Sequence, residues 1–402
     1  MAPTRLRKGA GGQARSNASR SVGTLLASTS RAPGKSTGIR LVIAALLATS
    51  SCVVATRVKA QTSPPPVHDP VIIRQNDAYY VFSTGRGVSV WRSTDLANWT
   101  ACDPVFSEPP DWIREMLPEF RNHFWAPDVY FRDGVYYLYY SVSEFGRNRS
   151  AIGVATNVTL NREDDDFQWI DRGKVVDSIP GRDMWNAIDS HVVQDDNDAP
   201  WMSFGSHWGG LKIVRLDANL TTLAEPQHWA TIAARHRYWK IDERDAGDSA
   251  NPELNYETLY PPQVLELNRS SESGAIEAPF IYRKHGYYYL FASWDRCCRG
   301  IESTYKVVVG RARQITGPYV DREGERMQHG GGSLVVQGVE ASRWAALGHN
   351  AVAEFDGVDY LVCHGYDKRD RGRSKLIVEP ITWDADLWPV VRVAADAPPD
   401  SR

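Results

Sequence analysis

A pattern that recurs five times constrains what this 402-residue chain can fold into more than any other feature. Each copy joins a short apolar strand to a second strand, which is aromatic in most copies, through a turn rich in Gly, Asp or Asn. The clearest copy runs from Ile276 to Trp294, with its turn at residues 284–286. Strand-turn-strand runs of this kind predict antiparallel hairpins.

The spacing of the copies predicts the fold. They begin 58, 62, 88 and 72 residues apart, counted through Asp69, Pro127, Asp189, Glu277 and His349. Each interval leaves room for two further strands, and only residues 110–117 look helical. Four-stranded units that repeat without helices predict an all-β fold, a five-bladed β-propeller. The first strand of each propeller blade lines the central channel, so we expect these five residues to form a ring at one end, with the active site there.

The N-terminal part of the chain differs in composition from the rest. The first 60 residues contain ten Lys or Arg, no acidic residue, and an apolar run from Leu41 to Ala55. That run is short for a membrane span and typical of a secretory signal. A transit peptide, a misassigned start codon and lipoprotein cleavage at Cys52 are the alternatives. We expect the mature protein to be secreted, to the periplasm or outside the cell.

These features give an expected domain plan. Residues 1–60 form the basic leader with its signal peptide, and 61–66 form a linker. Residues 67–395 form a single five-bladed catalytic propeller, and 396–402 form a disordered tail. Residues 235–262 are polar and charged without a strand pattern, so we expect a surface insertion there.

Charge limits the classes of binding partner, and the cysteine content limits the number of disulfides. Without the leader, 36 basic residues face 49 acidic ones, a net charge of −13. This balance argues against nucleic acid and membranes and suits a neutral substrate; we expect a monomer. Four cysteines outside the leader are too few for a disulfide scaffold. The adjacent Cys297 and Cys298 could form a vicinal disulfide or remain two thiols.

Three carboxylates in the ring predict hydrolysis of a glycosidic bond, which needs one acid and one base across a cleft. Glu277 sits in an apolar run, which favours a protonated acid, and Asp69 lies between His68 and Pro70 and suits the base. Asp189 would favour the protonated form of Glu277 through like-charge repulsion. Each carboxylate alone would more simply be a strand-start residue bonded to backbone N–H groups, but three in register favour catalysis. On spacing alone, His349 fits a core histidine or an ion ligand equally.

The segments around these residues resemble family 43 glycoside hydrolases. The motifs are His68–Pro70, Phe124–Val129, Asn186–Asp189 and Ile276–Phe280. Three further motifs, Phe204–Gly210, Trp294–Gly300 and Gly348–Asn350, with the glycines at 330–332, are similar to the endo-arabinanase branch. The resemblance covers His68 to Trp388. It implies cleavage of internal α-1,5-L-arabinofuranosidic bonds of arabinan with inversion, Asp69 as base, Glu277 as acid and Asp189 as pKa modulator. It also implies that His349 contacts a channel-bound calcium ion (Ca2+), mostly through water.

Substrate contacts are expected beside the carboxylates. Trp112, Phe124 and Trp208 could stack on furanose rings, although ordinary packing is the alternative for each. Asn186 and Ser206 are the expected polar contacts. His207 stands where the family usually has Phe, which bears on subsite preference. An exo-acting α-L-arabinofuranosidase or β-xylosidase on the same fold is the main alternative function, and a non-catalytic carbohydrate-binding propeller is another.

Overall fold

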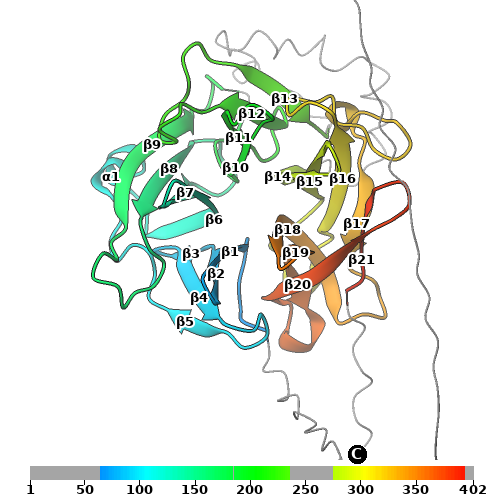
Figure 1. Cartoon of the computed structure of the whole chain (residues 1–402), viewed down its shortest axis with the longest axis horizontal. Coiled ribbons are helices and arrows are strands. Elements are labelled where there is room, and N and C mark those ends of the chain that lie inside the picture. The colour runs from blue at the N-terminus through cyan, green and yellow to red at the C-terminus, as the bar shows by residue number, and fades with distance from the viewer. Residues whose placement is uncertain (1–63, 184, 236–274, 394–402) are drawn as a thin grey trace, which may run out of the picture. The chain divides into compact units, whose positions relative to one another are not determined.

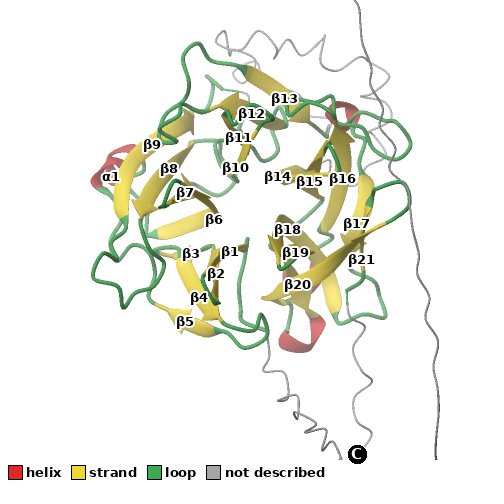
Figure 2. Ribbon diagram, viewed as in Figure 1, coloured by secondary structure: helices red, strands yellow, loops and turns green. Residues whose placement is uncertain are grey.

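Five antiparallel sheets build the described part of the computed structural model, which comprises residues 64–183, 185–235 and 275–393 (Figure 1, Figure 2). Blade one contains β1 (Val71–Gln75), β2 (Ala78–Ser83), β4 (Ser89–Ser93) and β5 (Thr100–Cys102). Blade two contains β6 (His123–Arg132), β7 (Val135–Ser143), β8 (Ser150–Asn157) and β9 (Ile170–Ser178), with the two-residue β3 (Gly85–Arg86) added at the edge of β6.

The other three sheets each use four consecutive strands. Blade three contains β10 (His191–Gln194), β11 (Pro200–Phe204), β12 (Leu211–Arg215) and β13 (Trp229–Ala233). Blade four contains β14 (Ile276–Lys284), β15 (Tyr287–Trp294), β16 (Lys306–Ala312) and β17 (Ser333–Gln337). Blade five contains β18 (Trp344–Phe355), β19 (Val358–Asp367), β20 (Arg373–Trp383) and β21 (Pro389–Val391). The predicted five-bladed propeller is confirmed.

The first strands of the blades surround a central axis (Figure 1). Each of β1, β6, β10, β14 and β18 contacts the next, and β18 contacts β1, which closes the ring. The segment before β1 strengthens this closure, because the carbonyl of Pro65 accepts a hydrogen bond from the N–H of Leu376 in β20 at 3.0 Å. The two ends of the propeller are therefore joined without a strand shared between blades.

Helices are few in the described residues. The α-helix α1 (Asp111–Met116) lies where residues 110–117 were predicted to be helical. The 3-10 turns are η3 (Gly300–Glu302), η4 (Met327–His329) and η5 (Lys368–Asp370). None of the helices described is long and apolar enough to cross a membrane. The leader and tail lie outside the described residues, as does the insertion after Arg235. Arg235 itself is not a surface residue: its guanidinium is paired with Asp295 at 2.6 Å, and its side chain is 9% exposed.

The tyrosines of the second strands join neighbouring blades. Tyr139 of β7 is fully buried, and its hydroxyl donates to the carbonyl of Leu220 in blade three at 2.6 Å. Tyr289 of β15 is also buried and donates to the carbonyl of Leu387 in blade five at 2.5 Å. A tyrosine ring fills the apolar space between sheets while its hydroxyl still finds a partner. The aromatic second strands of the repeats are thus inter-blade packing.

The residues at the channel mouth share an unusual backbone conformation. One residue per blade has a positive φ between 40° and 59°: Asp69, Ala126, Asp189, Ala278 and His349. The equivalent positions in blades two and four are therefore Ala126 and Ala278, and not Pro127 and Glu277 as the sequence alignment predicted. Bulges shift the register between Trp125 and Asp128 and between Glu277 and Phe280. A bulge adds a residue that hydrophobic alternation does not reveal.

Candidate active site

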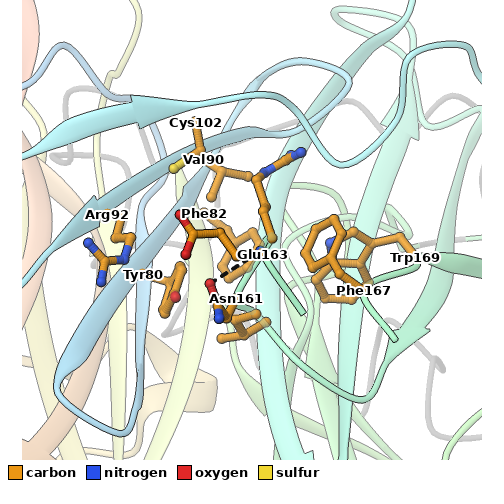
Figure 3. Close-up of a pocket in the computed structure, with 11 residues that line it drawn as sticks. Tyr80, Phe82, Val90, Arg92, Cys102, Asn161, Glu163, Phe167 and Trp169 are labelled. Atoms are coloured by element: carbon orange, nitrogen blue, oxygen red, sulfur yellow. Dashed lines mark hydrogen bonds between the residues drawn. The ribbon is translucent and has the colours of Figure 1, made fainter. Parts of the chain in front are cut away.

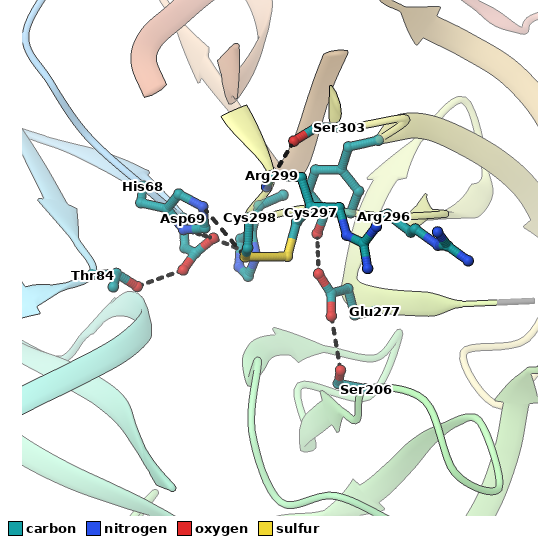
Figure 4. Close-up of a disulfide and its surroundings, with 12 residues drawn as sticks. His68, Asp69, Thr84, Ser206, Glu277, Arg296, Cys297, Cys298, Arg299 and Ser303 are labelled. Atoms are coloured by element: carbon teal, nitrogen blue, oxygen red, sulfur yellow. Dashed lines mark hydrogen bonds and ion pairs between the residues drawn. A yellow bond between two sulfur atoms is a disulfide. The ribbon is translucent and has the colours of Figure 1, made fainter. Parts of the chain in front are cut away.

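Asp69 is held by three polar side chains at the channel mouth, two of which, His68 and Thr84, are labelled in Figure 4. Its Oδ1 lies 2.8 Å from Nδ1 of His68 and 3.0 Å from Nδ1 of His349. Its Oδ2 accepts a hydrogen bond from the hydroxyl of Thr84 at 2.5 Å. Burial acts to raise the pKa of Asp69, but the imidazoles of His349 and His68 outweigh it and hold that pKa well below the ordinary value. Asp69 is therefore an ionised carboxylate at neutral pH.

The imidazoles around Asp69 differ in protonation. Burial acts to lower the pKa of His349, but the negative charge of Asp69 prevails and raises it to about 9. Burial lowers the pKa of His364 well below its usual value. Its Nδ1 accepts the backbone N–H of Asp69 at 3.1 Å, so the neutral ring carries its proton on Nε2. One charged and one neutral imidazole thus fix the position of Asp69.

Glu277 has neutral partners. Its Oε1 accepts from the hydroxyl of Tyr305 at 2.5 Å, and its Oε2 accepts from Ser206 at 2.8 Å. Two imidazoles lie nearby: Nε2 of His207 is 3.7 Å from Oε2, and a nitrogen of His349, which is paired with Asp69, lies within 4.8 Å of the carboxylate. The carboxyl side chain is 13% exposed, so it remains reachable from the channel mouth. Tyr305 stays neutral, because burial raises the pKa of its hydroxyl well above 10.0. Glu277 therefore lies in an environment without a firmly paired cation, unlike Asp69.

Asp189 lies beside Glu277. One polar atom each of Asp189, Glu277 and His349 lies within 4.8 Å of the others. Asp189 Oδ2 accepts the N–H of Ala278 at 3.2 Å, which ties it to the residue after Glu277. Burial raises the pKa of Asp189 to about 8, with Glu277 and Asp69 adding to the rise against the opposing effect of His349. Asp189 therefore keeps its proton near neutral pH, beside the carboxyl of Glu277.

This differs from the expectation that Asp189 stays ionised beside a protonated Glu277. Burial keeps a proton on Asp189 before substrate arrives. The sequence pattern cannot show which of the two carboxyls is the more buried in the fold. Asp189 is 6% exposed and fully enclosed, whereas Glu277 opens toward the channel mouth.

The Gly348–Asn350 motif positions these groups. A Cβ added to Gly348 would lie 2.0 Å from the ring of Tyr305, so only glycine leaves room for that ring. Asn350 donates through Nδ2 to the carbonyl of Ala278 at 3.2 Å and accepts through Oδ1 from Ser293 at 2.9 Å. Sequence reasoning missed Tyr305, and the glycine before His349 was the available signal for a closely packed ring.

Three of the expected substrate residues lie around the carboxylates. Ser206 contacts Glu277, as described above, so it touches the expected acid. Trp208 is half-buried on the same loop after β11. Asn186 is buried, and its Oδ1 accepts from the hydroxyl of Ser150 at 2.5 Å, so it anchors the segment that leads to Asp189. Their contact with a sugar stays a prediction.

The other two expected aromatic contacts are corrected. Phe124 is fully buried and stacks on Phe106 with ring centroids 5.0 Å apart, so no sugar ring can reach its face. Trp112 lies on α1, beside β9 at the outer edge of blade two (Figure 1), and donates through Nε1 to Asp171 at 3.1 Å. Proximity to a motif in sequence did not show which face of the blade each ring occupies. Phe145, which follows β7, is 84% exposed and was not singled out.

The donors near His349 bear on the expected calcium ion. Calcium takes six to eight oxygen ligands at about 2.3–2.6 Å. In the described residues, the group around His349 offers one imidazole nitrogen and the carboxyl groups of Asp189 and Glu277, and a bound cation would require His349 and Asp189 to give up their protons. The negative charge suits a cation, but the protein oxygens are too few for full direct coordination. These residues fit a calcium ion held mostly through its own water molecules, with His349 at its side.

Two further features lie outside the carboxylate cluster. Cys297 and Cys298 form a vicinal disulfide, which decides between the two alternatives left by the sequence (Figure 4). A cavity of about 210 Å³ lies where β2 and β4 of blade one meet the 160–169 loop of blade two (Figure 3). Its lining includes Tyr80, Arg92 and Trp169 but none of the expected site residues.

Comparison with known proteins gives consistent matches. The model of glycosyl hydrolases family 43 matches residues 63–389. A Cellvibrio japonicus protein named extracellular exo-alpha-(1->5)-L-arabinofuranosidase is 47% identical over 325 residues, covering 81% of this chain and 86% of the relative. A Bacillus subtilis extracellular endo-alpha-(1->5)-L-arabinanase is 34% identical, covering 80% of this chain and 87% of its own. The structure of Cellvibrio cellulosa alpha-L-arabinanase complexed with arabinohexaose is 46% identical, with a TM-score of 0.73, and covers 82% of this chain and 96% of that one.

Proposed function

The chain belongs to glycosyl hydrolases family 43, and on that premise we propose that it hydrolyses the α-1,5-linked arabinofuranose chains of arabinan. The observation that carries the proposal is the contrast between two carboxyls at one channel mouth. Asp69 is ionised among imidazoles, and Glu277 lies among neutral hydroxyls beside the proton-sharing Asp189. A base and an acid with separate partners are what hydrolysis of a glycosidic bond requires.

The residues divide the reaction as follows. Asp69 takes a proton from a water molecule whose oxygen attacks the anomeric carbon. Glu277 gives a proton to the glycosidic oxygen as its bond to that carbon breaks. Asp189 keeps a proton available to Glu277 and orients the adjacent backbone through Ala278. Because water enters opposite the leaving group, the anomeric configuration inverts.

We further propose that internal bonds are cleaved, as the motif resemblance implies and as the name of the Bacillus subtilis relative supports. Release of arabinose from chain ends is the second candidate, favoured by the name of the 47% identical relative. Products from linear arabinan separate the two modes. Early short oligosaccharides support internal cleavage, whereas arabinose as the sole early product supports attack from chain ends.

The surroundings of the enzyme are also part of the proposal. The basic and apolar leader supports secretion, and the relatives above are named extracellular. Mass spectrometry of the protein recovered from the medium or periplasm tests it, because a secreted product begins near residue 61. We propose that the enzyme acts as a monomer, which sedimentation at working concentration tests. We also propose a hydrated calcium ion beside His349.

Glu277→Gln and Asp69→Asn test the acid and base directly. Both should lose about 10²–10⁴-fold activity on arabinan, the usual size of a general acid or base contribution. An aryl arabinofuranoside with a good leaving group needs no acid, so Glu277→Gln should recover on it and Asp69→Asn should not. Glu323→Gln makes the same change at an exposed site and serves as control. Normal turnover of arabinan by either active-site variant would contradict the assignment.

A further inference from the structure

The vicinal disulfide lies beside the base (Figure 4). It belongs to the loop between β15 and η3, at the same end of the propeller as Asp69 and Glu277. Cys298 is exposed, and its Sγ lies 3.9 Å from Nε2 of His68. The reaction proposed above uses neither sulfur. The position of the pair therefore requires another explanation.

A chain of hydrogen bonds runs from the disulfide to the carboxylate of Asp69. The backbone N–H of Cys298 donates to the hydroxyl oxygen of Tyr366 at 2.7 Å. That hydroxyl lies 2.9 Å from Nε2 of His68, and Nδ1 of the same ring lies 2.8 Å from Oδ1 of Asp69. Because an ionised carboxylate only accepts hydrogen bonds, Nδ1 of His68 donates to Asp69, and in the neutral ring Nε2 accepts from the tyrosine hydroxyl. This places the His68 proton on Nδ1, facing Asp69.

The disulfide fixes the first link of this chain. The Cα atoms of Cys297 and Cys298 lie 3.8 Å apart, the usual spacing of neighbouring residues, whereas those of ordinary disulfides are usually about 4.4–6.8 Å apart. Closing so small a ring holds the intervening peptide in one arrangement. Cys298 has a φ of 66°, a conformation that L-residues rarely adopt without constraint. Opening the ring removes that constraint and frees the N–H to turn away from Tyr366.

We propose that the Cys297–Cys298 disulfide is a positioning element for the base, acting through Tyr366 and His68 on Asp69. The inference rests on the proposed function, because it takes Asp69 as the base. Its consequence is that the closed disulfide gives the active form. Opening the ring lowers kcat on every substrate, since the base is needed whatever the leaving group, and it changes KM less.

Reduction of the holoenzyme tests the idea. Dithiothreitol supplies two electrons and two protons, so the S–S bond becomes two thiols while the reductant closes to its own cyclic disulfide. Titration of thiols must show two new groups. The other described cysteines, Cys102 and Cys363, are already free and are not changed. Loss of one positioning hydrogen bond corresponds to roughly a 3- to 10-fold drop in kcat, on arabinan and aryl arabinofuranoside alike. Unchanged kcat with two new thiols overturns the proposal.

Tyr366→Phe makes the test specific. This variant keeps the ring but lacks the hydroxyl, so it should show the same loss before reduction and no further loss after it. An equal further loss on reduction would mean that the disulfide acts by another route. The double variant Cys297→Ser, Cys298→Ser should have the same kcat as the reduced enzyme, with melting temperature as the control for folding. If this variant does not fold, the loss of kcat on reduction and its recovery on reoxidation test the proposal instead. Asp69→Asn distinguishes failure of the proposed function from failure of this inference. If Asp69→Asn stays active, the proposed function is wrong. If Asp69→Asn is inactive but reduction leaves kcat of the wild type unchanged, only this inference is wrong.

Discussion

Asp189→Asn tests how the proton is kept near the expected acid. In the wild type, Asp189 keeps its proton up to about pH 8, because burial and the neighbouring carboxylates raise its pKa to about 8. Above that pH Asp189 is ionised and can no longer pass a proton to Glu277. Asparagine keeps an oxygen for the N–H of Ala278, but it cannot hold a proton and lacks the negative charge that Asp189 carries above about pH 8. The alkaline limb of kcat/KM should therefore move to lower pH.

The distance in the structure sets the size of this shift. The facing atoms of Asp189 and Glu277 lie within 4.8 Å. At that distance and an effective dielectric constant of about 20, one unit charge contributes roughly 3.5 kcal/mol, or about 2.5 pH units. Water at the open mouth screens part of it, so the expected shift is about 1–2.5 pH units. Maximal kcat should fall as well, because Asp189 no longer supplies a proton.

The melting temperature gives a second test, because the expected charge effect stabilises the Asp189→Asn variant relative to the wild type as pH rises, whereas a merely damaged fold would be less stable at every pH. Folded Asp189 keeps its proton to about pH 8, whereas an unfolded Asp ionises near about 3.9. The folded state then binds the extra proton, so this group's contribution to stability falls by up to about 1.4 kcal/mol per pH unit between those values. The asparagine variant lacks this loss, and its melting temperature should gain on the wild type from pH 5 to pH 8. An unmoved alkaline limb with a lowered melting temperature throughout would refute the reasoning and make Asp189 a structural strand-start residue.

Three further outcomes follow from the same geometry. Gly348→Ala should lower kcat on arabinan about 10-fold or more, since its Cβ would displace Tyr305 from Glu277; the melting temperature of the variant is the control for general damage to the fold. NMR of the first product should show inversion, and in a substrate complex the Asp69 and Glu277 carboxyls should lie about 6.5–9.5 Å apart; retention would contradict the mechanism. Chelation should lower activity or melting temperature, and His349→Ala should remove most of that response; if chelation changes neither property, no calcium ion supports this site.

The sequence was sufficient to predict the fold, because each repeat contains a hairpin whose strands and turn are recognisable from their residue types. The turn at His285–Gly286 has positive φ at both residues, the conformation that two-residue hairpin loops favour. What the sequence could not supply was the register at the channel mouth. Bulges place Glu277 one residue before the position equivalent to Asp69, and a bulge leaves the strand pattern on either side unchanged. Glu277 was predicted as the acid from its apolar neighbours in sequence, although the alignment treated it as equivalent to Asp69 when the equivalent residue is Ala278.

Side-chain partners were the second limit. Tyr305 reaches Glu277 from the connection between β15 and β16 of the same blade, 28 residues away in sequence, and its ring packs against Gly348 of blade five. The same limit explains Phe124, where a nearby motif suggested exposure but the blade interface buries the ring. The protonation of Asp189 also depends on how completely the neighbouring strands enclose it.

The surroundings of Asp69 and Glu277 decide their roles more firmly than their positions on the strands. An imidazolium at 3.0 Å favours a carboxylate, so exchanging the two side chains' surroundings would exchange base and acid. The neutral hydroxyls of Tyr305 and Ser206 orient Glu277 without supplying a positive charge that would hold it ionised. The imidazolium of His349 lies within 4.8 Å of Glu277, but Asp69 holds it at 3.0 Å, so the positive charge is paired with the base rather than with the acid.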